Sequence, residues 1–411
     1  GPWMTAFSYG TAYFSAVLFI GFAGKIGWGF GYSGLWIALG NTLIGVLGVW
    51  WVLGYRIKQM SIEYKVSTMA EYFEKRYDSK FLKMFSAVCI FVFFIPYSAA
   101  VFIGLSYLFR SNFNIDFTLA LVFMGLFTAI YLVLGGYKSM TMVDVFFGII
   151  MIVGVTILLF STIKSGGGFG NLAKDLQAIN PKLTGMVGPP GLWPLFCLVF
   201  LTSLAPMGMP QLVQKFYAIK DRRSIRIGMI ASSFFALLVC GTAYFTGATA
   251  RVFLNPATHP DAFTADGKPI FDALMPVLLS TVIPNSLSVL ILLLILSASM
   301  STLAALILIS SSSVTKDIYA GFINPKVSDK NLTLIMRCCS TFFILLSVIF
   351  AYYKPATIVS ILGISWGAIG SVFLGPFLWG LFWKGATRAG AIASSTLGLA
   401  TCIGLYLYGS S

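Results

Sequence analysis

Long apolar stretches alternate with short polar connections along most of this chain. A helix needs about 20 apolar residues to cross a bilayer, and stretches of that length recur. Runs such as Leu287 to Leu296 are almost continuously apolar, whereas a membrane β-barrel alternates apolar and polar residues. The pattern predicts an all-α, polytopic membrane protein with about eleven spans, at residues 4–25, 34–54, 82–109, 117–136, 140–163, 192–212, 227–250, 276–312, 333–353, 357–383 and 388–408.

Composition and charge support a membrane location. Hydrophobic residues make up 58% of the chain and charged residues 10%, a balance that a water-soluble protein does not carry. The net charge is +14, and 19 of the 27 Lys and Arg residues fall in loops on one side of the predicted membrane. Cytoplasmic loops carry such an excess. We therefore expect a multi-pass protein of the plasma membrane, with the lipid bilayer and not nucleic acid as its partner.

Metal and enzyme chemistry have little support in the sequence. The six cysteines lie in apolar runs, and His259 is the single histidine, so neither a disulfide framework nor a zinc site is indicated. We find no HExxH motif and no second acid well inside a predicted span, so we do not expect an enzyme. A span begins within a few residues of Gly1, and we expect that an N-terminal segment is missing.

Two predicted spans are interrupted by polar, Gly or Pro residues. The first contains SYGTAYFSA (Ser8 to Ala16) and the sixth contains LAPMGMPQ (Leu204 to Gln211). These spans lead two five-span units, which predicts inverted repeats at 1–163 and 192–383, an additional span at 388–408, and one transport domain over 1–411. Interrupted helices leave carbonyl groups that suit a cation, although Pro and Gly also produce simple kinks in membrane helices.

A polar face is predicted on the eighth span. Ala298, Ser301 and Thr302 are spaced i, i+3 and i+4, so they share one side of a helix. Two hydroxyl groups and a carbonyl group offer the oxygen ligands that sodium prefers. The alternative is that each hydroxyl bonds back to its own helix.

Asp144 is the only carboxylate well inside a predicted span. Acids in this environment are usually functional, so Asp144 is a candidate ion relay. The alternatives are that it pairs with Lys138 or caps its helix. Lys25, at the external end of the first span, either attracts an anionic substrate or extends to the interface. The aromatic rings that we consider for a pocket are those of Tyr13, Phe14, Phe19 and Tyr97.

Several segments resemble one transporter family. WMTAFSYGTAYFSAVLFIGFAG (Trp3 to Gly24) resembles the first core helix of sodium/solute symporters, close to the sodium/proline branch. Three further segments agree in order: TMAEYFEKRY (68–77), GGYKSMTMVD (135–144) and ASMSTLAALILISSSSVTKDIY (298–319). The resemblance implies a LeuT-type five-plus-five inverted repeat that carries solute inward with sodium by alternating access.

The resemblance also implies site residues. It places sodium at the carbonyls of Thr11, Phe14 and Ala298 and the hydroxyls of Ser301 and Thr302. It places substrate near Ser15, and a sodium passage toward the cytoplasm at Asp144. The substrate residues that we expect are Tyr13, Ser15, Phe19, Tyr97 and Thr202.

Departures from the family pattern bear on the solute. Tyr13 stands where proline symporters carry an aspartate, and Thr202 and Pro206 replace their substrate aromatics, so proline is doubtful. Leu18 and Leu35 stand at sugar-binding positions and disfavour a sugar. Ala304 and Ala305 replace the hydroxyls of a second sodium site, which predicts one sodium per cycle.

These patterns together predict a sodium-coupled symporter that imports a small polar organic solute, with Na⁺ as coupling ion and no obligate protein partner. One alternative is a proton-coupled or sodium-independent carrier that uses Asp144 as its relay. Another is a membrane sensor that has the same fold and does not transport.

Overall fold

The computed structural model describes residues 2–217, 219 and 221–410, and the side chains of these residues other than 2, 134–142 and 410. Its regular structure is helical, apart from a single β-bridge between Phe263 and Pro269 in this described part. The first half contains α1 (Pro2–Tyr13), η1 (Val17–Phe22), α2 (Ala23–Phe30), η2 (Gly31–Gly34), α3 (Leu35–Gly40), η3 (Asn41–Leu53), α4 (Gly54–Glu63), α5 (Met69–Tyr77), α6 (Lys80–Phe113), α7 (Phe117–Ser165), α8 (Phe169–Ile179) and η4 (Pro181–Thr184).

The second half begins with a broken helix and ends with four long helices. Its elements are α9 (Leu192–Leu204), η5 (Ala205–Gly208), α10 (Pro210–Tyr217), α11 (Arg222–Ala248), α12 (Ala250–Phe253), η6 (Pro260–Ala262), α13 (Phe271–Val282), η7 (Asn285–Leu287), α14 (Ser288–Ser312), η8 (Ser313–Ile323), α15 (Asp329–Tyr353), α16 (Ile358–Phe382) and α17 (Arg388–Ser410). The predicted all-α class is confirmed.

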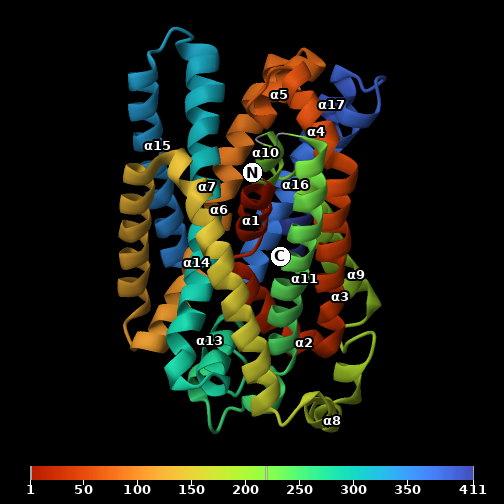
Figure 1. The fold of residues 1–411 in the computed structure, drawn as a ribbon, viewed down its shortest axis with the longest axis vertical. Helices are drawn as coiled ribbons and strands as arrows, with labels where there is room; N and C mark the ends of the chain where they lie inside the picture. The colour runs from red at the N-terminus through yellow and green to blue at the C-terminus, as the bar shows by residue number, and fades with distance from the viewer. Residues whose placement is uncertain (1, 218, 220, 411) are drawn as a thin grey trace.

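The number of spans depends on how broken helices are counted. Within the described ranges, eight helical runs are long and apolar enough to cross a membrane, and the bent pair formed by α9–η5 and α10 makes a ninth. The run from Val17 to Glu63 joins parts of the first two predicted spans, and the apolar arm Phe117–Val133 of α7 is shorter than the threshold for a span. The two arms of α7 run in opposite directions (Figure 1).

The predicted bounds of the eighth span, 276–312, are wrong. Its first part belongs to α13, which ends at Val282, and its second part belongs to α14, which begins at Ser288 and continues through η8 to Ile323. Pro284 lies at the break, where a proline disfavours helical backbone angles at the residue before it. Ile283 accordingly has extended backbone angles of φ −94° and ψ 127°.

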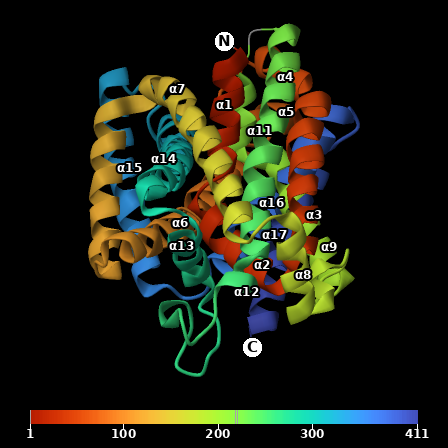
Figure 2. The same cartoon turned by 60° about the horizontal axis from the view of Figure 1, so that its bottom comes forward.

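The helices surround α1, which packs against α7, α11 and α14. The ends of α4, α5 and α10 lie toward the top of Figure 1, and α8 and α13 lie toward the bottom. The charge distribution identifies the top as cytoplasmic. Figure 2, which brings the bottom forward, shows α13 and α12 at the external face beside α2. The first interrupted helix therefore lies in the middle of the protein, where its free backbone groups are enclosed.

Candidate functional site

The first helix is broken where the sequence predicts, between Tyr13 and Val17. Two backbone N–H groups after the break bond to side chains instead of to carbonyls one turn earlier. The N–H of Ala16 donates to Ser299 Oγ at 2.9 Å, and the N–H of Val17 donates to Ser15 Oγ at 3.2 Å. The carbonyl groups four residues earlier therefore lose their usual partners, as at any helix end.

Thr302 on α14 lies beside carbonyl groups at this break and beside one carbonyl group of its own helix. Thr302 Oγ1 lies 3.1 Å from the carbonyl oxygen of Ala298, 3.3 Å from those of Thr11 and Ala12, and 3.5 Å from that of Phe14. A hydroxyl group carries one proton, so it donates to one acceptor at a time. The group of five oxygens, which we call the oxygen cage, is therefore electronegative and has more acceptors than donors.

A buried polar chain extends from the oxygen cage toward the cytoplasm. Ser301 Oγ donates to Asp144 Oδ1 at 2.6 Å and lies 2.9 Å from Thr11 Oγ1. Ser8 Oγ donates to Asp144 Oδ2 at 2.5 Å, and Lys215 Nζ lies 2.6 Å from Ser8 Oγ and 3.6 Å from Asp144 Oδ2. Asp144 is 2% exposed, so it depends on these partners.

Sequence reasoning missed Ser8 and Lys215. Lys215 follows the sixth predicted span, among the basic residues on the cytoplasmic side, yet its side chain reaches the buried acid of the fifth predicted span. The alternative in which Asp144 pairs with Lys138 concerns a side chain outside the described residues. No local pattern in the sequence identifies Lys215 as the partner, because the two residues belong to different helices.

A small cavity of about 30 Å³ lies on the external side of the break in α1, beside η1. A water molecule needs roughly 10–15 Å³ by this measure, so the cavity has room for only a few water molecules. Of the predicted substrate residues, Tyr13, Ser15, Tyr97 and Thr202 line it, and Phe19 is buried elsewhere in the core. The remaining lining residues are Phe14, Val17, Leu18, Phe22, Asn41, Tyr244, Leu362 and Trp366.

The cavity lining is partly polar and largely apolar, and it is uncharged. Its lining combines aromatic rings, hydroxyl groups and the Asn41 amide, and none of its twelve residues is acidic or basic. Tyr13 crosses it, since its hydroxyl donates to the carbonyl oxygen of Thr202 at 2.8 Å. The sequence could have indicated Asn41, because it is an amide within an apolar run. Nothing in the sequence distinguishes Tyr244 and Trp366 from the aromatic residues that are common in membrane helices.

The external side is closed by contacts among α2, α13 and α16. Lys25 Nζ lies 3.3 Å from Thr357 Oγ1 and 3.4 Å from Ser360 Oγ, so its ammonium group is engaged by protein. The Asp272 carboxylate accepts from the N–H of Ile358 at 3.3 Å, at the start of α16. Burial raises the pKa of Asp272 to about 6, against the smaller opposing effects of that hydrogen bond and of Lys25.

The cytoplasmic side contains a larger cavity of about 680 Å³. It lies between α4 and α10 on one side and α14, η8 and α15 on the other. Polar residues from both sides line it, including Lys58, Gln214, Ser312 and Lys316. The structure is therefore hollowed on the cytoplasmic side between these helices, while the contacts of Lys25 and Asp272 hold α2, α13 and α16 together on the external side.

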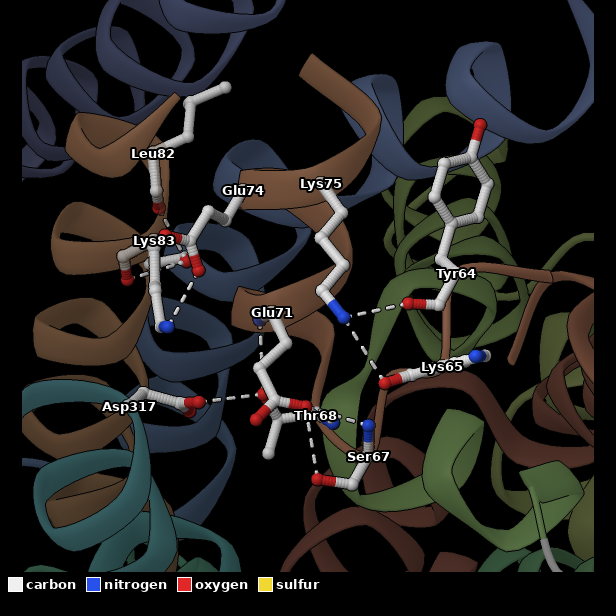
Figure 3. A network of polar contacts seen from close by, with 11 residues as sticks. Tyr64, Lys65, Ser67, Thr68, Glu71, Glu74, Lys75, Leu82, Lys83 and Asp317 are labelled. Carbon is white, nitrogen blue, oxygen red and sulfur yellow. Dashed lines mark hydrogen bonds and ion pairs between the residues drawn. The ribbon is translucent and has the colours of Figure 1, made fainter. Parts of the chain in front are cut away.

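A second polar network joins the cytoplasmic helix α5 to η8 (Figure 3). Thr68 begins α5 with a capping box, in which its hydroxyl accepts from the Glu71 N–H at 3.0 Å and Glu71 accepts from the Thr68 N–H at 3.3 Å. The Thr68 hydroxyl also donates to Asp317 Oδ1 at 2.8 Å. Lys83 pairs with Glu74 at 2.6 Å, which holds α5 against α6.

The fold and site define a class of protein: a helical membrane transporter with a discontinuous helix and an oxygen-rich site at its centre. A sequence model of the sodium:solute symporter family matches residues 1–398. The chain belongs to the sodium:solute symporter family. It is a sodium-coupled symporter and a multi-pass protein of the plasma membrane, which confirms both predictions.

Named relatives agree with this assignment. The chain is 29% identical over 417 residues to the osmoregulated proline transporter OpuE of Bacillus subtilis (strain 168), a match that covers 98% of the chain and 80% of the relative. It is 28% identical over 411 residues to a sodium/proline symporter of Staphylococcus aureus (strain bovine RF122 / ET3-1), covering 97% of the chain and 77% of the relative. The family and these relatives are transporters.

Solved structures show the fold. A Na⁺-coupled sialic acid symporter in a substrate-bound, outward-open state has a TM-score of 0.79 at 16% identity, over 98% of this chain and 88% of that one. A transporter of the nucleobase-cation-symport-1 family has a TM-score of 0.57 at 12% identity, over 99% of this chain and 91% of that one. The predicted LeuT-type, five-plus-five fold is confirmed.

Proposed function

We propose that the oxygen cage and Ser301 bind the coupling sodium ion. The ligands are the carbonyl oxygens of Thr11, Phe14 and Ala298 and the hydroxyl oxygens of Ser301 and Thr302. The observation that carries this proposal is the position of Thr302 Oγ1, within 3.5 Å of four carbonyl oxygens that one hydroxyl proton cannot satisfy. A hard monovalent cation supplies the missing positive charge, and the carbonyl of Ala12 is a further oxygen close to it.

We propose that a small polar organic solute binds in the cavity beside the break. Four of the five predicted substrate residues line this cavity, and the uncharged lining favours a solute that is neutral or zwitterionic. The same segment, Tyr13 to Ser15, contributes to the oxygen cage and to the cavity. Binding of sodium therefore shapes the solute site, and binding of solute shapes the sodium site. The family relatives named as proline symporters support an amino-acid-like solute, although Tyr13 and Thr202 make proline itself doubtful.

The cycle that we propose is alternating access with one sodium per solute. Residues 1–163 and 192–383 form the two inverted repeats, and 388–408 is additional. Sodium in the cage joins α1 to α14 and favours an outward-open state. The contacts of Lys25 between α2 and α16 on the external side, together with the cytoplasmic cavity, support an inward-facing arrangement for the present structure in this cycle. Coupling requires that sodium bind the two states with different affinity.

Thermal unfolding of the purified protein in sodium and in potassium, at equal ionic strength, tests the sodium site. A ligand that binds only the folded state stabilises it by about 2.7 kcal/mol at a hundred times its dissociation constant. We expect sodium to raise the unfolding midpoint of the parent and of Thr302→Ser, which keeps the hydroxyl group. The Ser301→Ala, Thr302→Val double variant should lose this effect. If sodium and potassium act alike on the parent at saturation, the proposal fails and a proton route through Asp144 takes its place.

A further inference from the structure

Asp144 divides its two oxygens between two different neighbours. Oδ1 accepts from Ser301, which also contacts Thr11 beside the oxygen cage. Oδ2 lies at the Ser8 hydroxyl and 3.6 Å from Lys215 Nζ. One carboxylate therefore serves the proposed sodium site through one oxygen and a lysine ammonium group through the other.

The lysine reaches this acid from an element suited to movement. Lys215 lies on α10, which begins at Pro210 and is bent by 43° from the α9–η5 segment that precedes it. Figure 1 places α10 beside the cytoplasmic end of α1, and the two helices pack together. Asp144 and Ser301 lie on α7 and α14, which pack tightly on each other. A shift of α10 relative to α7 and α14 therefore separates Lys215 from Asp144.

Charge balance makes the two cations competitors. The side chains of Asp144 and Lys215 are 3% and 11% exposed, so water screens their charges poorly. With Lys215 at Asp144 and the cage empty, the buried site is neutral. With sodium in the cage and Lys215 withdrawn, it is also neutral. With both cations present the site has a net charge of +1, and with neither it has −1, and both conditions are costly in a buried environment.

We infer that Lys215 is a tethered cation that competes with sodium for Asp144 and so drives sodium release toward the cytoplasm. This inference rests on the proposed sodium site. In the inward-facing arrangement described here, the ammonium group pairs with Asp144 and lowers the affinity of the neighbouring cage for sodium. In the outward-facing arrangement Lys215 is withdrawn, and Asp144 strengthens sodium binding through Ser301.

The tethered cation also explains a single-sodium stoichiometry. One turn beyond Ser301, the buried side chains of Ala304 and Ala305 offer no oxygen to a second ion near Asp144. The carboxylate nevertheless needs a partner when sodium leaves, and Lys215 supplies one that does not dissociate from the protein. Each cycle then moves one sodium, because the second positive charge returns with α10.

Sodium titration of the purified full chain, followed by the shift in unfolding midpoint at constant ionic strength, tests this inference. We expect Lys215→Met, which keeps the length of the side chain and removes its charge, to lower the apparent sodium dissociation constant at least about fivefold. Lys215→Arg keeps the charge and should stay within about twofold of the parent. In the Asp144→Asn, Lys215→Met double variant the gain should disappear, because it acts through an unpaired Asp144.

The outcomes separate this inference from the proposed function. If the parent shows no sodium-specific stabilisation, the sodium site itself fails. If the parent responds and Lys215→Met is folded with unchanged or weaker sodium affinity, the pair is merely structural and the inference is overturned. Ser8→Ala gives a second reading should Lys215→Met fail to fold. It removes the hydroxyl bridge between Lys215 and Asp144, so we expect a smaller increase in sodium affinity, and an unchanged or weaker affinity overturns the inference.

Discussion

Gly24 allows α2 to lie directly against α13, and an alanine there should hold the external side open. A Cβ atom at this position would lie 2.7 Å from the carbonyl oxygen of Phe271 and 3.4 Å from Met275 Cγ. Ordinary contact begins at 3.4 Å, so α2 and α13 must separate by about 0.7 Å to admit the methyl group. The oxygen belongs to the backbone and cannot rotate away.

The penalty falls on the externally closed state, in which α2 and α13 touch. Inserting a methylene into a well-packed contact costs about 1–3 kcal/mol. A difference of that size shifts a two-state equilibrium by about 5–150-fold. Gly29→Ala is the matched control, because Gly29 lies on the same helix and a Cβ there meets no atom within 4 Å. Both variants gain the same helix propensity, so their difference reports the steric contact.

The assay is external labelling of a cysteine in the cavity. Leu18 lines the cavity, so Leu18→Cys, in a background without the six native cysteines, reports access from outside to a membrane-impermeant maleimide. Gly24→Ala should increase the labelling rate at least about fivefold, and Gly29→Ala should leave it unchanged. Equal rates in two folded variants would refute the reasoning, since they would mean that the α2–α13 contact does not control external closure.

Three further predictions concern stability. Thr68→Ala removes the cap of α5 and a donor to buried Asp317, so the free energy of unfolding should fall by about 2–4 kcal/mol in thermal or denaturant unfolding. Asp272→Asn should flatten the pH dependence of stability. The raised pKa of about 6 means that the folded protein favours the neutral acid. The contribution of Asp272 to the free energy of unfolding is therefore complete below about pH 4 and is lost as the pH rises through 6. The total change in this contribution is about 3 kcal/mol. Tyr13→Phe removes the donor to the Thr202 carbonyl, so the free energy of unfolding should fall by about 1–3 kcal/mol. Thermal unfolding measures this loss, and the KM for solute uptake is measured in parallel.

Each of these predictions has an outcome that contradicts it. A Thr68→Ser variant keeps the hydroxyl group, so an equal loss in Ser and Ala variants would exclude the cap and the Asp317 bond as the cause. Unchanged stability between pH 4 and pH 7 in the parent would mean that Asp272 is not buried as described. Parent-like stability in Tyr13→Phe would mean that the bond across the cavity contributes nothing.

Local patterns in the sequence were enough for the fold class and part of the site. Hydropathy sets which segments enter the bilayer, and the distribution of basic residues sets which side faces the cytoplasm. The break in the first helix was readable from Ser8 to Ala16, and helical spacing placed Ser301 and Thr302 on one face. Pro284 also indicated a break in the sequence. The apolar residues on both sides of it nevertheless led to a prediction of one span, which the structure divides into two helices.

Only the tertiary structure decided which helices meet. Ser8 and Asp144 are 136 residues apart and Lys215 and Ser8 are 207 apart, yet the three form one buried cluster. Hydropathy and periodicity describe each helix alone, whereas pairing depends on how the broken helices pack against α7 and α14. The sequence therefore determined that this protein is a membrane transporter with an oxygen-rich break in its first helix. Packing between distant helices determined the cation that balances its buried acid, because a buried charge must find a partner wherever the fold brings one.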